Sequence, residues 1–322
     1  MTRPPRPPGL QAIFDELAAA PPAASLAALN RQFANRVAAY NTSPQAELGG
    51  LSPDQMQQIL RGDWDTIGAL RVNPGLTLDR LRDVPFVADA RTLLQYVAEH
   101  APVPLTPRGN LKRTAVADLV PSLLMDSDLD AADADDERPA MPPIVIRNEG
   151  DAFWLVVLRT VLQFGKLLAT RKGVILSIRG KLLLQENSAG ALYSQLFRTF
   201  FREFDLRYFG FDDRHPGLQA TLAWTLYQLG QMPEGWASVE LLADRAWLAD
   251  TKEPMTARDQ EFGDMRQHVF EARVLRPLCL FGVLERRRVR AEVWYRDSME
   301  YRRTPLFGTV LRFEFTGTPP RR

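Results

Sequence analysis

An internal repeat constrains this chain more than any other feature of its sequence. Residues 91–96, Arg-Thr-Leu-Leu-Gln-Tyr, recur as residues 159–164, and residues 105–111 recur as residues 176–182, in the same order. A third, partial copy relates residues 274–284 to residues 157–167 through Val-Leu-Arg and Phe-Gly-x-Leu. Such a pattern indicates one supersecondary unit used several times. We therefore expect several small modules and not one large core.

The repeated segments predict short strands that lead into capped helices. Ser177 and Thr106 each follow an apolar pair, where a hydroxyl can accept from the free amides of a following helix, and Pro107 suits the first helical position. Residues 171–173, Arg-Lys-Gly, predict a turn between strands at 167–169 and 174–176. The expected unit is therefore a helix, a two-stranded ribbon and a capped helix.

This passage resembles the wing and following helix of winged helix-turn-helix proteins such as the MarR and PadR families. The resemblance rests on Phe164-Gly165, Phe281-Gly282 and the Leu-Ser-Ile-Arg-Gly run at 176–180. The third copy has no Leu-Thr-x-x-Gly cap after its ribbon. The resemblance implies that the ribbon tips, or wings, contact phosphates in DNA-binding members, while the helix before each wing enters the major groove.

The expected fold is mainly α with small β-hairpins, built from two or three winged-helix-like modules in tandem and an N-terminal helical extension. The extension covers 1–50, the modules cover 51–125, 144–250 and 251–322, and an acidic, Pro-flanked linker covers 126–143. Residues 283–295 and 306–315 are expected to pair as a hairpin, with Arg302 and Arg303 near its connection.

The linker contains seven acids within residues 126–137. Asp126, Asp128, Asp130 and Glu137 match positions 1, 3, 5 and 12 of an EF-hand loop, but Ala131 stands where the sharp turn needs glycine. A run of acids with few apolar residues cannot pack, so an acidic flexible linker is favoured over a calcium loop.

Composition narrows the classes of function. The formal net charge is +1, so any nucleic-acid contact has to come from local clusters of cations. A single cysteine permits neither an internal disulfide nor a zinc cage, and no run is apolar enough to span a bilayer. We expect a cytoplasmic protein.

Two local clusters are the candidate DNA contacts of a DNA-associated transcriptional regulator. They are the tip of the 167–176 ribbon and the first strand of the C-terminal hairpin: Arg171, Lys172, Arg286, Arg287, Arg288 and Arg290. The alternative is a protein-interaction module or scaffold of a multi-component bacterial system, because residues 156–164 are mostly apolar and offer few base-reaching side chains. Pairing of the arginines with Glu285, Glu292 or Glu300 would favour this alternative.

A second possible interaction element is the helix expected over 190–208. Its aromatic stripe could bind a protein partner or a second copy, but a helix with one aromatic face normally buries that face in its own domain, which is the favoured interpretation. The stripe consists of Tyr193, Phe197, Phe200, Phe201, Phe204 and Tyr208.

Enzymatic chemistry finds little support in the sequence, and no cofactor or metal is expected. His100, His215 and His268 are widely spaced, and no phosphate-binding loop or nucleophile elbow is present. Cys279 lies among apolar residues that raise the pKa of a thiol, which suits a structural cysteine better than a nucleophile.

Overall fold

The computed structural model describes residues 13–15, 18–19, 24–125, 146–209, 214–248, 265–289 and 298–316. The described chain is mainly helical with a few small antiparallel sheets. It forms two compact units, residues 1–70 with 314–322, and residues 71–313. The acidic linker at 126–143 lies outside the described residues, as does Arg290.

Unit 1 contains α2 (Leu26–Thr42), the 3-10 turn η1 (Ala46–Leu48) and α3 (Pro53–Leu60). Ser52 caps α3 in a reciprocal capping box with Gln55, and Pro53 occupies the first turn, where its missing amide costs nothing. Gln58 of α3 accepts from the backbone amide of Thr316, which fastens the C-terminal segment to this unit.

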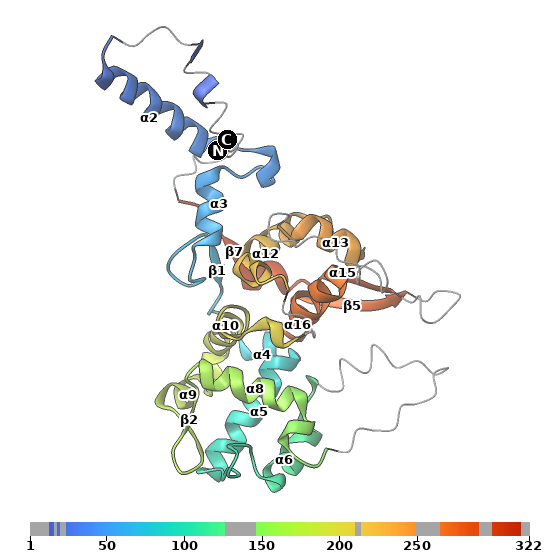
Figure 1. Ribbon diagram of the computed structural model, residues 1–322. Coiled ribbons are helices and arrows are strands. Elements are labelled where there is room, and N and C mark those ends of the chain that lie inside the picture. Colours follow the sequence, from blue (N-terminus) through green and yellow to red (C-terminus); the bar gives the residue numbers. More distant parts are fainter. Residues whose placement is uncertain are drawn as a thin grey trace. The chain divides into compact units, whose positions relative to one another are not determined.

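The first half of unit 2 packs three helices on a small sheet (Figure 1). Its elements are β1 (Leu70–Val72), α4 (Leu78–Leu81), α5 (Pro85–His100), α6 (Arg113–Leu119), η2 (Val120–Ser122), η3 (Glu149–Asp151), α8 (Phe153–Phe164), β2 (Leu168–Thr170), β3 (Val174–Leu176) and α9 (Ile178–Leu183). β2 and β3 form the expected antiparallel hairpin. Val103, just after α5, adds an antiparallel bridge to Val174, so the order across the sheet is Val103, β3, β2.

The second half of unit 2 also contains a hairpin that is followed by a short helix. It contains α11 (Gly217–Ala220), α12 (Leu222–Gln231), β4 (Ala237–Ser238), α13 (Val239–Ala246), α15 (Met265–Phe270), the π-helix η8 (Glu271–Leu275), α16 (Arg276–Leu280), β5 (Leu284–Val289), β6 (Ser298–Arg303), α17 (Phe307–Val310) and β7 (Leu311–Phe313). The sheet order is β4, β6, β5, so the short strand after the first helix again borders the last strand. β7 pairs with β1.

Both halves close their hairpins with the same hydrogen bonds. Before the hairpin, Lys166 (φ 57°) and Gly282 (φ 70°) adopt the left-handed conformation, and the next amide donates back across the helix end, from Leu167 to Leu162 and from Val283 to Leu278. After the hairpin, a hydroxyl donates to the carbonyl of that left-handed residue, Ser177 to Lys166 and Thr304 to Gly282, each at 2.6 Å. By these hydrogen bonds Lys166 corresponds to Gly282, whereas the Phe-Gly repeat in the sequence aligns Gly165 with Gly282. The structural and sequence alignments therefore differ by one residue.

The segment between the halves forms the shared core. α10 (Ala189–Arg198) continues into the π-helix η5 (Thr199–Glu203) and, after a break, the 3-10 turn η6 (Leu206–Tyr208), where one unbroken helix was expected. One face approaches the end of α8 so closely that a Cβ on Gly165 would lie 3.2 Å from Thr199 Oγ1. Another face surrounds Phe281 at the end of α16, and the Tyr193 hydroxyl donates to the Phe281 carbonyl at 2.9 Å.

Two buried carboxylates hold loops of the first half in place. Glu149 pairs with Arg159 of α8 and accepts from the Leu111 amide at 2.6 Å. Asp89 of α5 accepts from the amides of Leu124 and Met125. Because a buried acceptor must be satisfied, these contacts fix the segments on either side of the linker against α5 and α8.

Three expectations are corrected. Thr106 is not a helix cap: it closes a turn with Asn110 in which Gly109 has φ 82°, and α6 begins seven residues later. The partner of the C-terminal strand at 284–289 is 298–303, not 306–315, because residues 307–313 form α17 and β7. Arg302 and Arg303 therefore lie in β6 and not in the connection.

Candidate functional site

The outward face of the β4–β6–β5 sheet contains two arginines and two glutamates that lie close together. Strand alternation places Glu285 and Arg287 of β5 beside Glu300 and Arg302 of β6. Arg287 Nη2 lies 2.7 Å from Glu300 Oε2, and Arg302 Nε lies 2.6 Å from Glu285 Oε1. The hydrogen bond to Glu285 raises the pKa of Arg302. The two cations on this face are thus neutralised by carboxylates of the same hairpin.

Trp236, just before β4, joins these pairs. The guanidinium carbon of Arg287 lies 4.6 Å from its ring centroid and that of Arg302 lies 4.5 Å from it. Cation–π contact holds both guanidinium groups against the ring while they bind their carboxylates. The face is therefore a preformed network of ion pairs and cation–π contacts.

The other predicted arginines of this hairpin are directed differently. Arg286 pairs in register with Tyr301 and Arg288 with Met299, on the face that also contains the buried Leu284 and Tyr301. Both are half-buried. The structure therefore does not bring Arg286, Arg287 and Arg288 together on one surface.

Arg171 and Lys172, the two predicted site residues of the first hairpin, are exposed to solvent. Both are exposed at the β2–β3 turn, where Lys172 has φ 52° and Gly173 has φ 145°. A Cβ at Gly173 would lie 2.6 Å from the Val103 carbonyl oxygen, so the close approach of the first strand requires glycine there. Figure 1 shows the β2–β3 hairpin and β5 in different parts of unit 2.

The helix before this turn, α8, exposes few polar side chains that could contact the edges of DNA bases. Its buried positions are Leu155, Val157, Leu158, Val161 and Leu162. Its outward positions include the exposed Phe153 and Phe164 and the half-buried Val156, whereas its single cation, Arg159, is paired with Glu149. A recognition helix needs several polar side chains on one exposed face, which α8 lacks.

The aromatic helix is core and not surface. Tyr193, Phe197, Phe200, Phe201 and Phe204 are all buried, and Tyr208 is the exposed member of the stripe. The favoured interpretation of the stripe as core is confirmed for the five buried rings.

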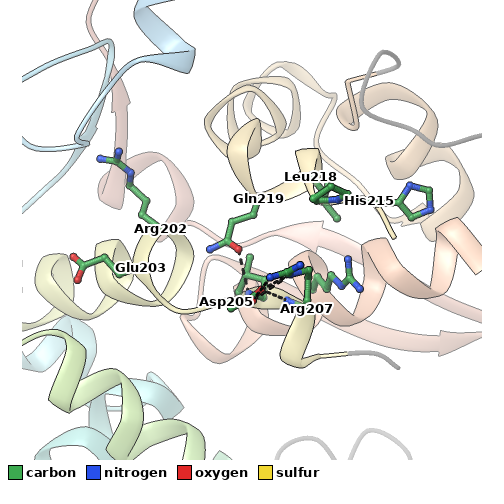
Figure 2. Close-up of a pocket in the computed structure, with 10 residues that line it drawn as sticks. Arg202, Glu203, Asp205, Arg207, His215, Leu218 and Gln219 are labelled. Atoms are coloured by element: carbon green, nitrogen blue, oxygen red, sulfur yellow. Dashed lines mark hydrogen bonds and ion pairs between the residues drawn. The ribbon is translucent and has the colours of Figure 1, made fainter. Parts of the chain in front are cut away.

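A pocket of about 340 Å³ lies between η5, η6 and α11, and Arg273 of η8 also lines it (Figure 2). Arg207 donates to both oxygens of Asp205, at 3.0 and 2.7 Å, and these hydrogen bonds lower the pKa of Asp205. Figure 2 shows Arg202 and Glu203 pointing away from this pair. The charged side chains do not converge on a common point where a reacting group could sit.

The cysteine and two of the histidines considered in the sequence analysis occupy packed surroundings. Burial raises the pKa of the Cys279 thiol to about 12, so the thiolate needed for attack is disfavoured, as expected from its apolar neighbours. His100 stacks on Tyr96, and buried His215 lies against Trp247. No three His, Cys, Asp or Glu side chains among the described residues are grouped as a metal site.

Sequence reasoning missed one exposed surface. Ile178 and Leu182 of α9 are 82% and 57% exposed, Arg179 and Lys181 lie on the same helix, and the carbonyl of Lys166 binds Ser177 in front of it. The signal was present as apolar residues four apart, but the same run had been interpreted only as a helix cap. Trp236, which organises the charged sheet face, was also missed.

Comparisons with known proteins add one match. Residues 82–189 match the family model of the Y4jL N-terminal domain, a stretch that contains α5 to α9. No curated protein and no solved structure matches the chain. Within the described residues, no helix has the length and apolar character needed to cross a membrane.

Proposed function

We propose that unit 2 contains two winged-helix modules, covering residues 85–183 and 222–310, in place of the three modules that the sequence suggested at 51–125, 144–250 and 251–322. Each has a first helix, a short strand, a second helix, a third helix and a hairpin, and in each the short strand borders the last strand of the hairpin. This order of elements supports the proposal, as do the matching hydrogen bonds of Ser177 and Thr304. The Y4jL match covers the whole of the first module.

The function that the geometry supports best is protein interaction by a tandem winged-helix scaffold. The observation that carries this proposal is the pairing of Arg287 with Glu300 and of Arg302 with Glu285 across the second wing. Phosphate binding there would compete with carboxylates that already form hydrogen-bonded ion pairs with both arginines. The apolar outward positions of α8 also favour protein interaction over DNA binding.

DNA binding is the second candidate, and the exposed Arg171 and Lys172 favour it. No described residue forms an ion pair with either side chain. Two cations at a wing tip could contact two phosphates, which is enough for weak, sequence-independent attachment.

One experiment separates the two candidates. The tagged full-length chain is purified from its own cells with and without nuclease, and its retention of duplex DNA is measured across a salt series. A stoichiometric protein partner that survives nuclease supports the scaffold. Absence of such a partner, together with DNA retention that falls steeply with salt, would refute it.

Two variants identify the residues responsible for any DNA retention. If the first wing binds phosphates, replacing Arg171 and Lys172 with alanine lowers the slope of log K against log salt by about 2. Arg287→Ala is the matched control, because Arg287 is paired with Glu300 and is expected to leave the slope unchanged.

A further inference from the structure

The outward face of α9 combines apolar exposure with cations that have no carboxylate partner. Gly180 faces inward, since a Cβ there would lie 2.2 Å from the Leu167 carbonyl oxygen. The helical period then places Ile178 and Leu182 at the centre of the opposite face, with Arg179 and Lys181 on its two sides. Exposed apolar residues scattered singly are ordinary, but a neighbouring pair on one helix is a contiguous patch.

The winged-helix fold does not require this patch. Ser177 and Thr304 are equivalent by their hydrogen bonds, so Ile178 corresponds to Pro305 and Leu182 to Thr309 in the second module. The second module thus closes its hairpin without large apolar side chains at these positions. The exposed apolar pair is therefore specific to the first module.

The charges around the patch indicate what covers it. Lys166 lies at the base of α9, because its carbonyl accepts from the Ser177 hydroxyl, and Lys181 follows Gly180 on the helix. Both side chains are exposed, and no described residue forms an ion pair with either. Arg179 donates to Gln195 and likewise binds no carboxylate among the described residues. An apolar strip bordered by cations is complementary to an amphipathic helix with acidic flanks.

We propose that α9 is the docking site for an acidic amphipathic helix of a protein partner, with Ile178 and Leu182 as apolar anchors and Lys166 and Lys181 as charge partners. This assignment rests on the protein-interaction function proposed above, and it names the surface and the chemistry of the partner. Burial of the two anchors provides most of the affinity, and the lysines select acidic over basic helices.

The test uses labelled synthetic amphipathic peptides and fluorescence anisotropy with the full-length chain. A peptide with one apolar face and glutamate flanks is expected to bind, whereas the same peptide with lysine flanks is not. Replacing both anchors, Ile178→Thr and Leu182→Thr, imitates the polarity of the second module and is expected to weaken binding at least about tenfold. Ile67→Thr, at another exposed isoleucine, is the control and should change nothing.

A charge variant keeps the proposal falsifiable if the anchor variant folds poorly. Lys181→Glu is expected to weaken binding of the acidic peptide severalfold and to strengthen binding of the lysine-flanked one. Equal binding of both peptides, or unchanged binding by the anchor and charge variants, would overturn the proposal.

Other occupants of α9 give distinct results. Self-association of the unaltered chain that disappears in the anchor variant would assign the face to a second copy. Peptide binding that appears only after the seven acids at 126–137 are neutralised would assign it to the chain's own acidic segment. Either result overturns docking of a partner helix.

Failure of this surface can be distinguished from failure of the proposed function. A nuclease-resistant protein partner that binds the anchor variant with unchanged affinity would leave the scaffold function intact and overturn the α9 assignment.

Discussion

Replacement of Phe281 by alanine tests whether the two halves of unit 2 share one core. Phe281 is fully buried, and its ring centroid lies 4.6 Å from that of Phe86 on α5. The corresponding distances are 5.2 Å to Phe197 on α10 and 5.3 Å to Phe200 on η5. Removing a buried phenylalanine typically costs about 3–5 kcal/mol through lost transfer energy and the cavity left behind. The upper part of this range is expected because the ring is enclosed by elements that are fixed elsewhere.

Urea denaturation monitored by tryptophan fluorescence, together with a thermal scan, measures this loss. For a unit of this size we expect Tm to fall by about 10 °C. Phe164→Ala is the matched control, since Phe164 is 49% exposed and its loss should cost no more than about 1 kcal/mol. The shared-core argument is refuted if the two variants lose similar stability, or if Phe281→Ala unfolds like the wild type.

Three further changes test local interactions. Gly282→Ala should cost about 1–3 kcal/mol in urea denaturation, because φ is +70° and the new Cβ would lie 3.0 Å from Val84 Cγ2; Gly308→Ala, where nothing lies within 4 Å, is the control. Glu149→Gln leaves Arg159 without its carboxylate and should cost about 3–5 kcal/mol by the same assay; a loss below 1 kcal/mol would contradict this. Burial alone would raise the pKa of Asp63, but hydrogen bonds from Thr66 and three backbone amides hold it well below its usual value. Since the charged form is favoured in the folded state, the stability that wild type gains over Asp63→Asn should be present above about pH 4 and be lost as pH falls further; a pH-independent difference would contradict this.

Local sequence signals identified many elements correctly because their causes are local. Ser177 accepts from the amide three residues ahead, and this cap was predicted from a hydroxyl in front of a helical run. The β2–β3 hairpin followed from two short β-branched or apolar runs around Arg-Lys-Gly. The buried aromatic stripe followed from spacings of three and four.

The cap pattern gave a wrong prediction at Thr106, where a closed turn forms in place of a helix start. Thr106 begins a pattern like that of Ser177, but its hydroxyl accepts from Asn110 within a closed turn, and the following helix starts later. In the second half of unit 2, Thr304 forms the same hydrogen bond as Ser177 although its surrounding sequence lacks the expected cap pattern. Sequence similarity therefore aligned Thr106 with Ser177, although their hydrogen bonds differ. It did not identify Thr304, whose hydrogen bond matches that of Ser177.

The sequence by itself determined that the chain is mainly helical with small hairpins, and which arginines gather near the C-terminus. Only the tertiary structure decided which strands pair, because β6 and β7 are both plausible partners of β5 and their choice depends on contacts distant in sequence. The tertiary structure also decided which arginines are paired with carboxylates. Whether an arginine is available to a partner depends on the carboxylate opposite it, as Arg287 and Glu300 show, and strand register is a property of the folded chain.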